Sequence, residues 1–185
     1  MASLDVIFKA YDIRGTVPEQ LDAETCRRVG AAFARFSEAP RIVIGRDMRE
    51  SGIELSQAFA EGATSVGANV VDLGLASTDL LYFASGQLDA PGAMLTASHN
   101  PARYNGIKLC LPGAQPVGQD TGLDRIRSTA QGYLADGLPE PVAEGARPGR
   151  VTHRDLLADY AGYLRGLVDL SGSWPRRRAR RSSTT

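Results

Sequence analysis

The sequence predicts an α/β fold in which helices cover both faces of a sheet. Short segments rich in β-branched residues alternate with segments of helical periodicity, and this order is typical of βαβ units. The chain has 185 residues, 43% of them hydrophobic and 23% charged, so it can bury a sizeable core. This composition argues against wholesale disorder. No apolar run reaches the roughly 20 residues of a membrane-spanning helix, so we expect no membrane partner.

The first elements follow from apolar spacing and from the residues that cap or break it. Residues 8–15 form a short mixed segment that ends in a glycine turn. Apolar residues recur at helical spacing over residues 23–37, which predicts a helix with Asp22 as its N-cap and Pro40 beyond its end. Residues 41–45 are apolar and β-branched up to a glycine, which predicts a short buried strand.

The alternation of helices and strands continues through the middle of the chain. We predict a helix over residues 51–66, a strand over 69–74, a helix over 78–85 capped by Ser77 or Thr78, and strands over 92–96 and 106–110. In such sheets, ligands bind in loops beyond the carboxyl ends of strands. The loops after Gly45, Gly74 and Thr96 are therefore the places to search for functional residues.

Beyond residue 111 the chain becomes richer in proline and glycine. A last helix of the domain is predicted over residues 122–131, and helical spacing resumes over residues 152–170. We therefore divide the chain into an α/β/α domain over 1–135, a linker over 136–150, a helix over 151–173 and a basic tail over 174–185.

Charge is unevenly distributed, although 21 basic and 21 acidic residues give a formal net charge of zero. Five arginines and no acidic residue lie within residues 174–185, so the rest of the chain has 16 basic and 21 acidic residues and a net charge of −5. An acidic body gives no reason to expect a nucleic-acid partner. A basic tail that binds anionic partners is the alternative.

The cysteine content and the N-terminal residues bear on the compartment. Cys26 and Cys110 cannot form a disulfide framework, which favours a reducing environment. Residues 1–9 do not show the basic and apolar regions of a signal peptide. We therefore expect a cytoplasmic location.

The loop after the strand at 92–96 contains the most informative polar residues. Ser98, His99 and Asn100 follow the strand directly, and Pro101 biases Asn100 away from helical backbone angles. Such a loop can present backbone N–H groups to an anion, a hydroxyl nucleophile and an imidazole that moves a proton. A polar turn without a function is the alternative that these residues alone leave open.

Lys108 is one of only two lysines in a chain that otherwise uses arginine. A compact ammonium suits phosphate, so we consider Lys108 a candidate ligand for phosphate; a solvated strand lysine is the alternative. The preceding dipeptide, Asn105-Gly106, is typical of a hairpin turn and predicts one there.

Two arginines in the loop after the strand at 41–45 allow two interpretations. Arg46 and Arg49 could bind phosphate, or they could pair with Asp47 and Glu50 and brace the loop. The second interpretation is favoured, because charge pairs of this spacing are common in loops.

Five segments, taken together, resemble the α-D-phosphohexomutase family in its bacterial phosphomannomutase/phosphoglucomutase branch. They are FKAYDIRG from residue 8, GRDMRESG from residue 45, STDLLYFASG from residue 77, TASHNP from residue 96 and YNGIK from residue 104. Their order and spacing are similar to those of the first domain of that family, over residues 4–173. The resemblance implies a three-layer α/β/α domain with a mixed, largely parallel sheet.

The resemblance also implies an activity and residue roles. The family isomerises hexose 6-phosphate and hexose 1-phosphate through a phosphoserine and a hexose 1,6-bisphosphate intermediate, so a phosphosugar is the expected partner. Ser98 would carry the phosphoryl group, and its phosphate would bind Mg²⁺. The other implied roles are proton transfer by His99, charge neutralisation by Lys108 and Arg14, phosphate binding by Asn100, and a border of the site at Tyr11. Phosphoryl transfer depends mainly on positioning and charge neutralisation, which such a set can supply.

Three segments expected from the resemblance are missing from this sequence. The family's later domains bring an aspartate-rich DGDGD metal loop, a GEMSGH sugar loop and a phosphate-binding loop, none of which occurs here. We therefore expect weak Mg²⁺ binding and little or no turnover by this chain alone. A reading frame truncated or frameshifted near residue 173 is our hypothesis for the arginine-rich tail.

Two further expectations concern what the chain binds. The alternative to a mutase is a non-catalytic phosphosugar-binding module, or a subunit completed by another chain. The helix over residues 153–167 has no evident partner in the sequence that follows it, so we expect it to favour self-association.

Overall fold

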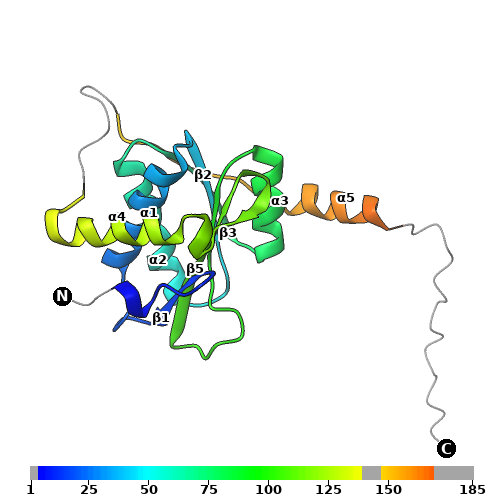
Figure 1. Cartoon of the computed structure of the whole chain (residues 1–185). Helices are drawn as coiled ribbons and strands as arrows, with labels where there is room; N and C mark the ends of the chain where they lie inside the picture. The colour runs from blue at the N-terminus through cyan, green and yellow to red at the C-terminus, as the bar shows by residue number, and fades with distance from the viewer. Residues whose placement is uncertain (1–3, 139–146, 169–185) are drawn as a thin grey trace, which may run out of the picture.

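A computed structural model describes residues 4–138 and 147–168, and these build a three-layer α/β/α domain (Figure 1). The predicted tail at 174–185 and part of the linker lie outside the described residues. The strands of the sheet are β1 (Ile13–Thr16), β2 (Arg41–Arg46), β3 (Asn69–Leu75), β4 (Gly92–Leu95), β5 (Tyr104–Leu111), β6 (Gln115–Pro116) and β7 (Val151–His153). Their order is β1-β5-β4-β2-β3-β7, with β6 beside β5.

The sheet is mixed, as predicted, because one of its described strands runs against the others. β4, β2, β3 and β7 pair in parallel. β5 pairs antiparallel with β4, β1 and β6, and it therefore opposes the common direction. The parallel strands all end at one edge, and the loop between β4 and β5 emerges there.

Four helices form the two outer layers, and a fifth follows the last strand. They are α1 (Ala23–Ser37), α2 (Ser51–Ser65), α3 (Thr78–Leu88), α4 (Leu123–Asp136) and α5 (Leu157–Leu167). In Figure 1, α1, α2 and α4 lie on one side of the sheet, α3 lies on the other, and α5 extends away beyond α3. Short 3₁₀ segments at Leu4–Val6, Pro112–Ala114 and Gln119–Thr121 complete the described elements.

The larger hydrophobic core lies between the sheet and the layer of α1, α2 and α4. Phe33 and Phe59 are fully buried at its centre, with ring centroids 6.3 Å apart. The two helices that carry them approach closely through a pair of glycines: a Cβ at Gly30 would lie 2.1 Å from the Phe59 carbonyl oxygen, and one at Gly62 would lie 1.8 Å from that of Arg27. These distances leave no room for any larger residue at either position.

A smaller core lies under α3 on the other face of the sheet. It comprises Val43, Leu80, Leu81, Ala84, Ala90, Met94 and Leu156. The Ser77 side chain accepts a hydrogen bond from the backbone N–H of Leu80 and so caps α3, which settles the choice between Ser77 and Thr78 in favour of Ser77. α3 ends three residues later than predicted, at Leu88, where Asp89 adopts left-handed backbone angles.

The helix bounds confirm much of the pattern analysis. The helix predicted over residues 23–37 is α1 itself, and the Asp22 side chain accepts the predicted capping hydrogen bond, from the N–H of Thr25. The predicted helix over residues 122–131 is present as α4 but runs on to Asp136.

The prediction of a hairpin turn at Asn105-Gly106 is wrong, because both residues lie within β5. Gly106 serves close packing instead: a Cβ there would lie 2.3 Å from the carbonyl oxygen of Ile13 on the neighbouring strand. The buried Asn105 amide donates to the Ser51 hydroxyl at the start of α2, at 2.9 Å. A dipeptide that favours turns is therefore explained here by sheet packing.

The prediction of a helix starting at residues 151–152 is also wrong. Residues 151–153 form β7 at the edge of the sheet, and helix α5 begins only at Leu157. β7 has three residues and is exposed along its length, so it carries no alternation of apolar and polar side chains that would have revealed it.

Helix α5 contacts the domain through aromatic side chains. The rings of Tyr160 and Tyr163 lie 5.4 and 5.3 Å from that of Phe83 on α3, and Leu156 just before α5 is buried. The helix predicted to have no partner thus packs in part on α3. Among the described helices, none has the length and apolar character needed to cross a membrane.

Candidate functional site

The loop that joins β4 to β5 places Ser98 at the carboxyl edge of the sheet. Ser98 is exposed, and its φ of +53° lies in the left-handed region that non-glycine residues rarely adopt. Its hydroxyl lies 3.3 Å from Nδ1 of His99. The structure therefore brings together the two residues that the sequence proposed as nucleophile and proton carrier.

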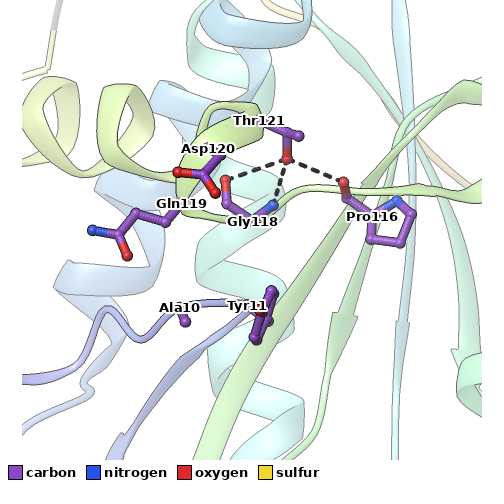
Figure 2. Close-up of a pocket in the computed structure, with 7 residues that line it drawn as sticks. All are labelled: Ala10, Tyr11, Pro116, Gly118, Gln119, Asp120 and Thr121. Carbon is purple, nitrogen blue, oxygen red and sulfur yellow. Dashed lines mark hydrogen bonds between the residues drawn. The ribbon is translucent and has the colours of Figure 1, made fainter.

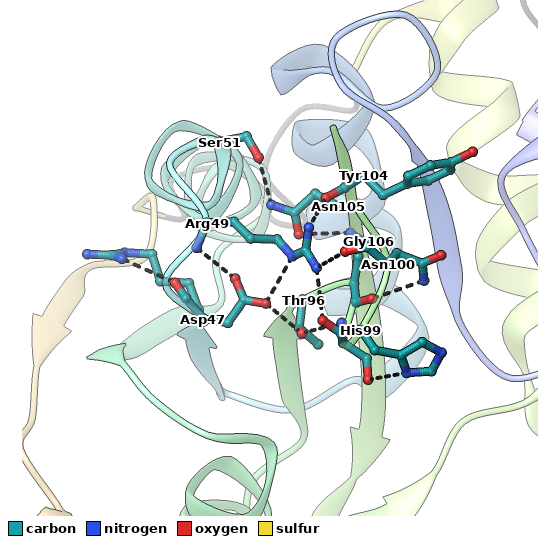
Figure 3. Close-up of polar contacts among 12 residues, drawn as sticks. Asp47, Arg49, Ser51, Thr96, His99, Asn100, Tyr104, Asn105 and Gly106 are labelled. Carbon is teal, nitrogen blue, oxygen red and sulfur yellow. Dashed lines mark hydrogen bonds and ion pairs between the residues drawn. The ribbon is translucent and has the colours of Figure 1, made fainter. Parts of the chain in front are cut away.

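Hydrogen bonds fix the backbone on both sides of the Ser98 side chain (Figure 3). The Ser98 N–H donates to the Thr96 hydroxyl at 3.0 Å, and that hydroxyl donates to Asp47 Oδ2 at 2.8 Å. The Ser98 carbonyl oxygen accepts from Nη2 of Arg49 at 2.9 Å. Ser98 itself is exposed, and its hydroxyl lies beside Nδ1 of His99.

Arg49 pairs with Asp47, as the favoured interpretation predicted, and it also braces the neighbouring loop that carries Ser98, which that interpretation did not include. Its guanidinium donates to Asp47 and to four backbone carbonyl oxygens, those of Ser98, Asn100, Pro101 and Tyr104. Of its side chain, 10% is exposed. Within the described residues, the Arg46 side chain donates to the Asp47 carbonyl oxygen at 3.4 Å and forms no ion pair, so the predicted charge pairing does not extend to it.

Asn100 has a structural contact that its sequence position did not reveal. Its amide donates to the carbonyl oxygen of Ala97 at 3.0 Å, and its backbone N–H donates to the same oxygen. The amide therefore closes the turn that carries Ser98.

Arg14 and Lys108 lie on the face of the sheet that carries the smaller core. Lys108 is opposite Met94 in the β4–β5 register, and Arg14 is opposite Gly106 in the β1–β5 register. Directly opposed residues share a face, and residues two apart on a strand do so too. Both cations are thus on the Met94 side. Lys108 is on β5, next to β4, whose carboxyl end leads to Ser98, and Arg14 is on β1, one strand further away.

The contacts of these two cations leave donors available. Arg14 forms an ion pair with Asp12, and its Nε is buried without a hydrogen-bond partner among the described residues. Lys108 is half-buried and pairs with no acidic side chain in the part of the chain that the structure describes. Cationic side chains with N–H groups not used by acidic partners suit the neutralisation of phosphate charge.

A hollow of about 380 Å³ adjoins Ser98 on this same face. Ser98, Thr96 and Met94 line one side of it, and Ser77 and Thr78 at the start of α3 line another. The hollow has room for a small polar molecule beside the Ser98 hydroxyl.

Tyr11 borders a different hollow from the one beside Ser98. Its side chain is 78% exposed and lines a hollow of about 230 Å³ with Pro116, Gly118 and Thr121 (Figure 2). The backbone there is joined by the bond from the Gln119 N–H to the Ala10 carbonyl oxygen, at 2.9 Å. The structure therefore does not place Tyr11 in the hollow that Ser98 lines.

The described residues do not by themselves fit Mg²⁺. Within residues 4–138 and 147–168, no three acidic, histidine or cysteine side chains lie close enough together to hold a metal ion. Asp47 is linked to Ser98 through Thr96, and its Oδ2 already accepts hydrogen bonds from the Thr96 hydroxyl and from Arg49. Mg²⁺ requires about six ordered oxygen ligands, and a serine-linked phosphate alone would leave most of them to water.

Sequence reasoning did not connect two residues of the network, Thr96 and Asp47, to Ser98. Each is one member of a segment that the resemblance did use, TASHNP and GRDMRESG. Only the parallel pairing of β2 with β4, which sets Arg46 beside Leu95, shows that these two segments meet. To predict this network, one has to know that the ends of β2 and β4 are adjacent, and a single sequence does not show which strands are neighbours.

Comparison with known proteins finds a family and several relatives. The family described as phosphoglucomutase/phosphomannomutase, alpha/beta/alpha domain I, matches residues 5–134. A phosphomannomutase of Escherichia coli is 39% identical over 165 residues, which are 89% of this chain and 35% of that protein. A phosphomannomutase of Klebsiella pneumoniae is 39% identical over 83% of this chain and 95% of its own sequence.

A solved structure extends this similarity to the fold. A phosphoglucomutase/phosphomannomutase family protein of Burkholderia thailandensis superposes with a TM-score of 0.74 at 32% identity, over 90% of this chain and 36% of that one. The chain thus spans about a third of the length of the Escherichia coli and Burkholderia relatives.

Proposed function

The chain belongs to the phosphoglucomutase/phosphomannomutase family, and from this membership we propose that Ser98 carries the phosphoryl group in the interconversion of hexose 6-phosphate and hexose 1-phosphate. The observation that carries the proposal is the arrangement of the Ser98 loop. An exposed hydroxyl lies beside an imidazole, on a backbone fixed by hydrogen bonds, next to a hollow. Positioning of this kind accounts for much of the catalysis of phosphoryl transfer.

The proposed step moves one phosphoryl group from a hexose 1,6-bisphosphate to Ser98. The Ser98 oxygen forms a bond to phosphorus, and the bond from phosphorus to the sugar oxygen breaks. The hydroxyl proton passes to Nδ1 of His99 and then to the sugar oxygen that leaves, so a hexose monophosphate and a phosphoserine result. In the complete cycle, the phosphoserine first gives its phosphoryl group to the free hydroxyl of one hexose monophosphate to form the bisphosphate. The bisphosphate then turns round and returns the phosphoryl group of its other position to Ser98 by the step above, which leaves the isomeric monophosphate.

Lys108 and Arg14 would neutralise the charge of the transferring group. Their place on the Met94 face, and the free donors that they retain among the described residues, support this role. Asn100 would act on phosphate only through the turn that its amide closes. Tyr11 lines a different hollow from the one beside Ser98. It would therefore contact only a part of the sugar phosphate that extends out of the Ser98 hollow.

The rest of the activity is proposed to need more than the described residues. Mg²⁺ would require oxygen ligands from outside them, so no step above is assigned to the ion. The chain spans about a third of its longer relatives, and we expect little complete turnover from it alone. Self-association through residues 153–167 stays a prediction, supported by exposed Leu157, Leu164 and Leu167.

Phosphoryl transfer into the chain tests the proposal. The 185-residue chain is incubated with glucose 1,6-bisphosphate, and its intact mass is followed with time. We expect the chain to gain the mass of one phosphoryl group and the Ser98→Ala variant to gain none. Ser128→Ala, which removes an exposed hydroxyl from α4 on the opposite face, should gain one like the unmodified chain.

Two results would contradict the proposal. Equal phosphoryl gain by Ser98→Ala would place the acceptor elsewhere. Binding of the bisphosphate without transfer would instead favour the non-catalytic phosphosugar-binding module.

A further inference from the structure

A closed ring of hydrogen bonds holds both backbone polar groups of Ser98 (Figure 3). The ring runs from the Ser98 N–H to the Thr96 hydroxyl at 3.0 Å and on to Asp47 Oδ2 at 2.8 Å. The same carboxylate oxygen accepts from Nε of Arg49 at 3.3 Å, and Nη2 of Arg49 returns to the Ser98 carbonyl oxygen at 2.9 Å. Three residues that follow two neighbouring strands, Thr96, Asp47 and Arg49, thus fix one peptide unit on each side of Ser98.

Arg49 also forms hydrogen bonds to the loop beyond Ser98. Its guanidinium also donates to the carbonyl oxygens of Asn100, at 2.7 Å, Pro101, at 2.9 Å, and Tyr104, at 2.8 Å. All three of its nitrogen atoms are used, and its side chain is almost fully buried. The guanidinium therefore has no N–H group directed at the hollow that the Ser98 hydroxyl borders, and it acts on the loop alone.

The backbone of Ser98 needs such support. A serine with a φ of +53° is held in a sparsely populated region, and such residues persist only where their surroundings fix them. A free loop would relax toward negative φ and turn the Ser98 hydroxyl away from Nδ1 of His99, now 3.3 Å distant. The hydrogen bonds to the N–H and carbonyl of Ser98 oppose that rotation.

We propose that Arg49 is a positioning residue for Ser98: through its hydrogen bonds to Asp47 and to the loop carbonyls, it holds the Ser98 hydroxyl in the geometry that accepts a phosphoryl group. This inference rests on the function proposed above. The residue must be arginine, because its planar fork reaches carbonyl oxygens on both sides of Ser98 at once. A lysine presents one compact ammonium that cannot span them.

Rates of Ser98 phosphorylation test the proposal in the 185-residue chain. With glucose 1,6-bisphosphate as donor, we expect Arg49→Lys to lower the maximal rate by about 100-fold, the loss typical of a reacting group displaced by about 1 Å. The half-saturating donor concentration should stay unchanged, because Arg49 directs no donor at the hollow. Arg46→Lys, the same exchange three residues earlier, should leave both constants as they are.

A second variant breaks the ring at its other side. Thr96→Val removes the hydroxyl that joins the Ser98 N–H to Asp47 and leaves Arg49 in place. We expect a fall in maximal rate in the same direction and smaller than that of Arg49→Lys. If Arg49→Lys does not fold, as judged by its thermal transition, Thr96→Val decides the proposal.

Backbone dynamics separate a failure of this proposal from a failure of the proposed function. In the unmodified chain, we expect ¹⁵N order parameters near 0.85 for the amides of Ser98, His99 and Asn100, and values below about 0.6 in Arg49→Lys. This readout needs no phosphoryl transfer. Folded Arg49→Lys and Thr96→Val with unchanged order parameters and maximal rates would overturn the positioning role; a chain that accepts no phosphoryl group would overturn the proposed function alone.

Discussion

The two faces of the sheet differ in how much core they bury and in what they carry. Among the described residues, the core under α1, α2 and α4 contains 28 buried residues, and the core under α3 contains seven. Arg14, Lys108 and the hollow beside Ser98 all lie on the face of the smaller core. The comparison indicates that stability comes chiefly from one face and that the other is left open enough for a site.

The Ser98 loop stands at the edge between the two faces, where polar contacts replace apolar packing. Arg49 and Asp47 support it through hydrogen bonds, since Ser98 and His99 are themselves exposed. Hydrogen bonds of this kind fix the position of the site residues and leave the site open to a ligand.

The largest expected effect on stability is in the larger core. Phe59→Ala should lower the free energy of unfolding by about 3–5 kcal/mol, because it leaves a cavity against Phe33 in a fully buried position. Denaturant titration followed by circular dichroism measures the change. A loss below about 1 kcal/mol would show that this face does not dominate stability.

A smaller effect is expected where two helices meet backbone to backbone. Gly62→Ala should destabilise the chain by about 1–3 kcal/mol or more, because the new Cβ would lie 1.8 Å from the Arg27 carbonyl oxygen. Gly86→Ala on α3 is the matched control: no atom lies within 4 Å of its Cβ position, so the variant should be up to about 1 kcal/mol more stable. Thermal melts of both variants decide the matter, and similar losses at the two sites would refute the packing argument.

The smallest expected effect concerns the two buried thiols. Burial raises the pKa of the Cys26 thiol, as do the nearby carboxylates of Asp22 and Glu54; burial also raises the pKa of Cys110, against hydrogen bonds from Ser85 and Gly92. Both thiols should therefore react slowly with a disulfide reagent at neutral pH. We expect Cys110, on the face of the smaller core, to react about tenfold faster than Cys26, because a face with fewer buried contacts should open at a lower free energy. Equal rates would contradict the difference between the faces.

Local patterns in the sequence were enough to predict the regular elements of the larger core. Asp22 and the apolar spacing after it predicted α1 to the residue, because a cap and a periodicity are both local signals. β7 and the place of Gly106 depend on contacts between strands distant in the sequence. No local pattern contains such contacts.

The candidate site divides in the same way. Ser98 and His99 lie next to each other in the chain, so the sequence could propose both as candidates, and the structure places the Ser98 hydroxyl 3.3 Å from Nδ1 of His99. The network through Thr96 and Asp47 forms only because β2 and β4 are neighbours, and the separation of Tyr11 from the Ser98 hollow follows from where β1 joins the sheet. These two features of the site depend on tertiary contacts, which the spacing of residues in the sequence does not show.

Amide chemical-shift mapping during phosphoryl transfer tests most directly the claim that the site belongs to the smaller-core face and its edge. The ¹⁵N-labelled chain is compared before and after exposure to glucose 1,6-bisphosphate. We predict that the largest shifts occur at residues 96–104, at Asp47 and Arg49, and at Arg14 and Lys108, with α1, α2 and α4 unchanged. Largest shifts within α1, α2 and α4, with the 96–104 loop unaffected, would contradict it.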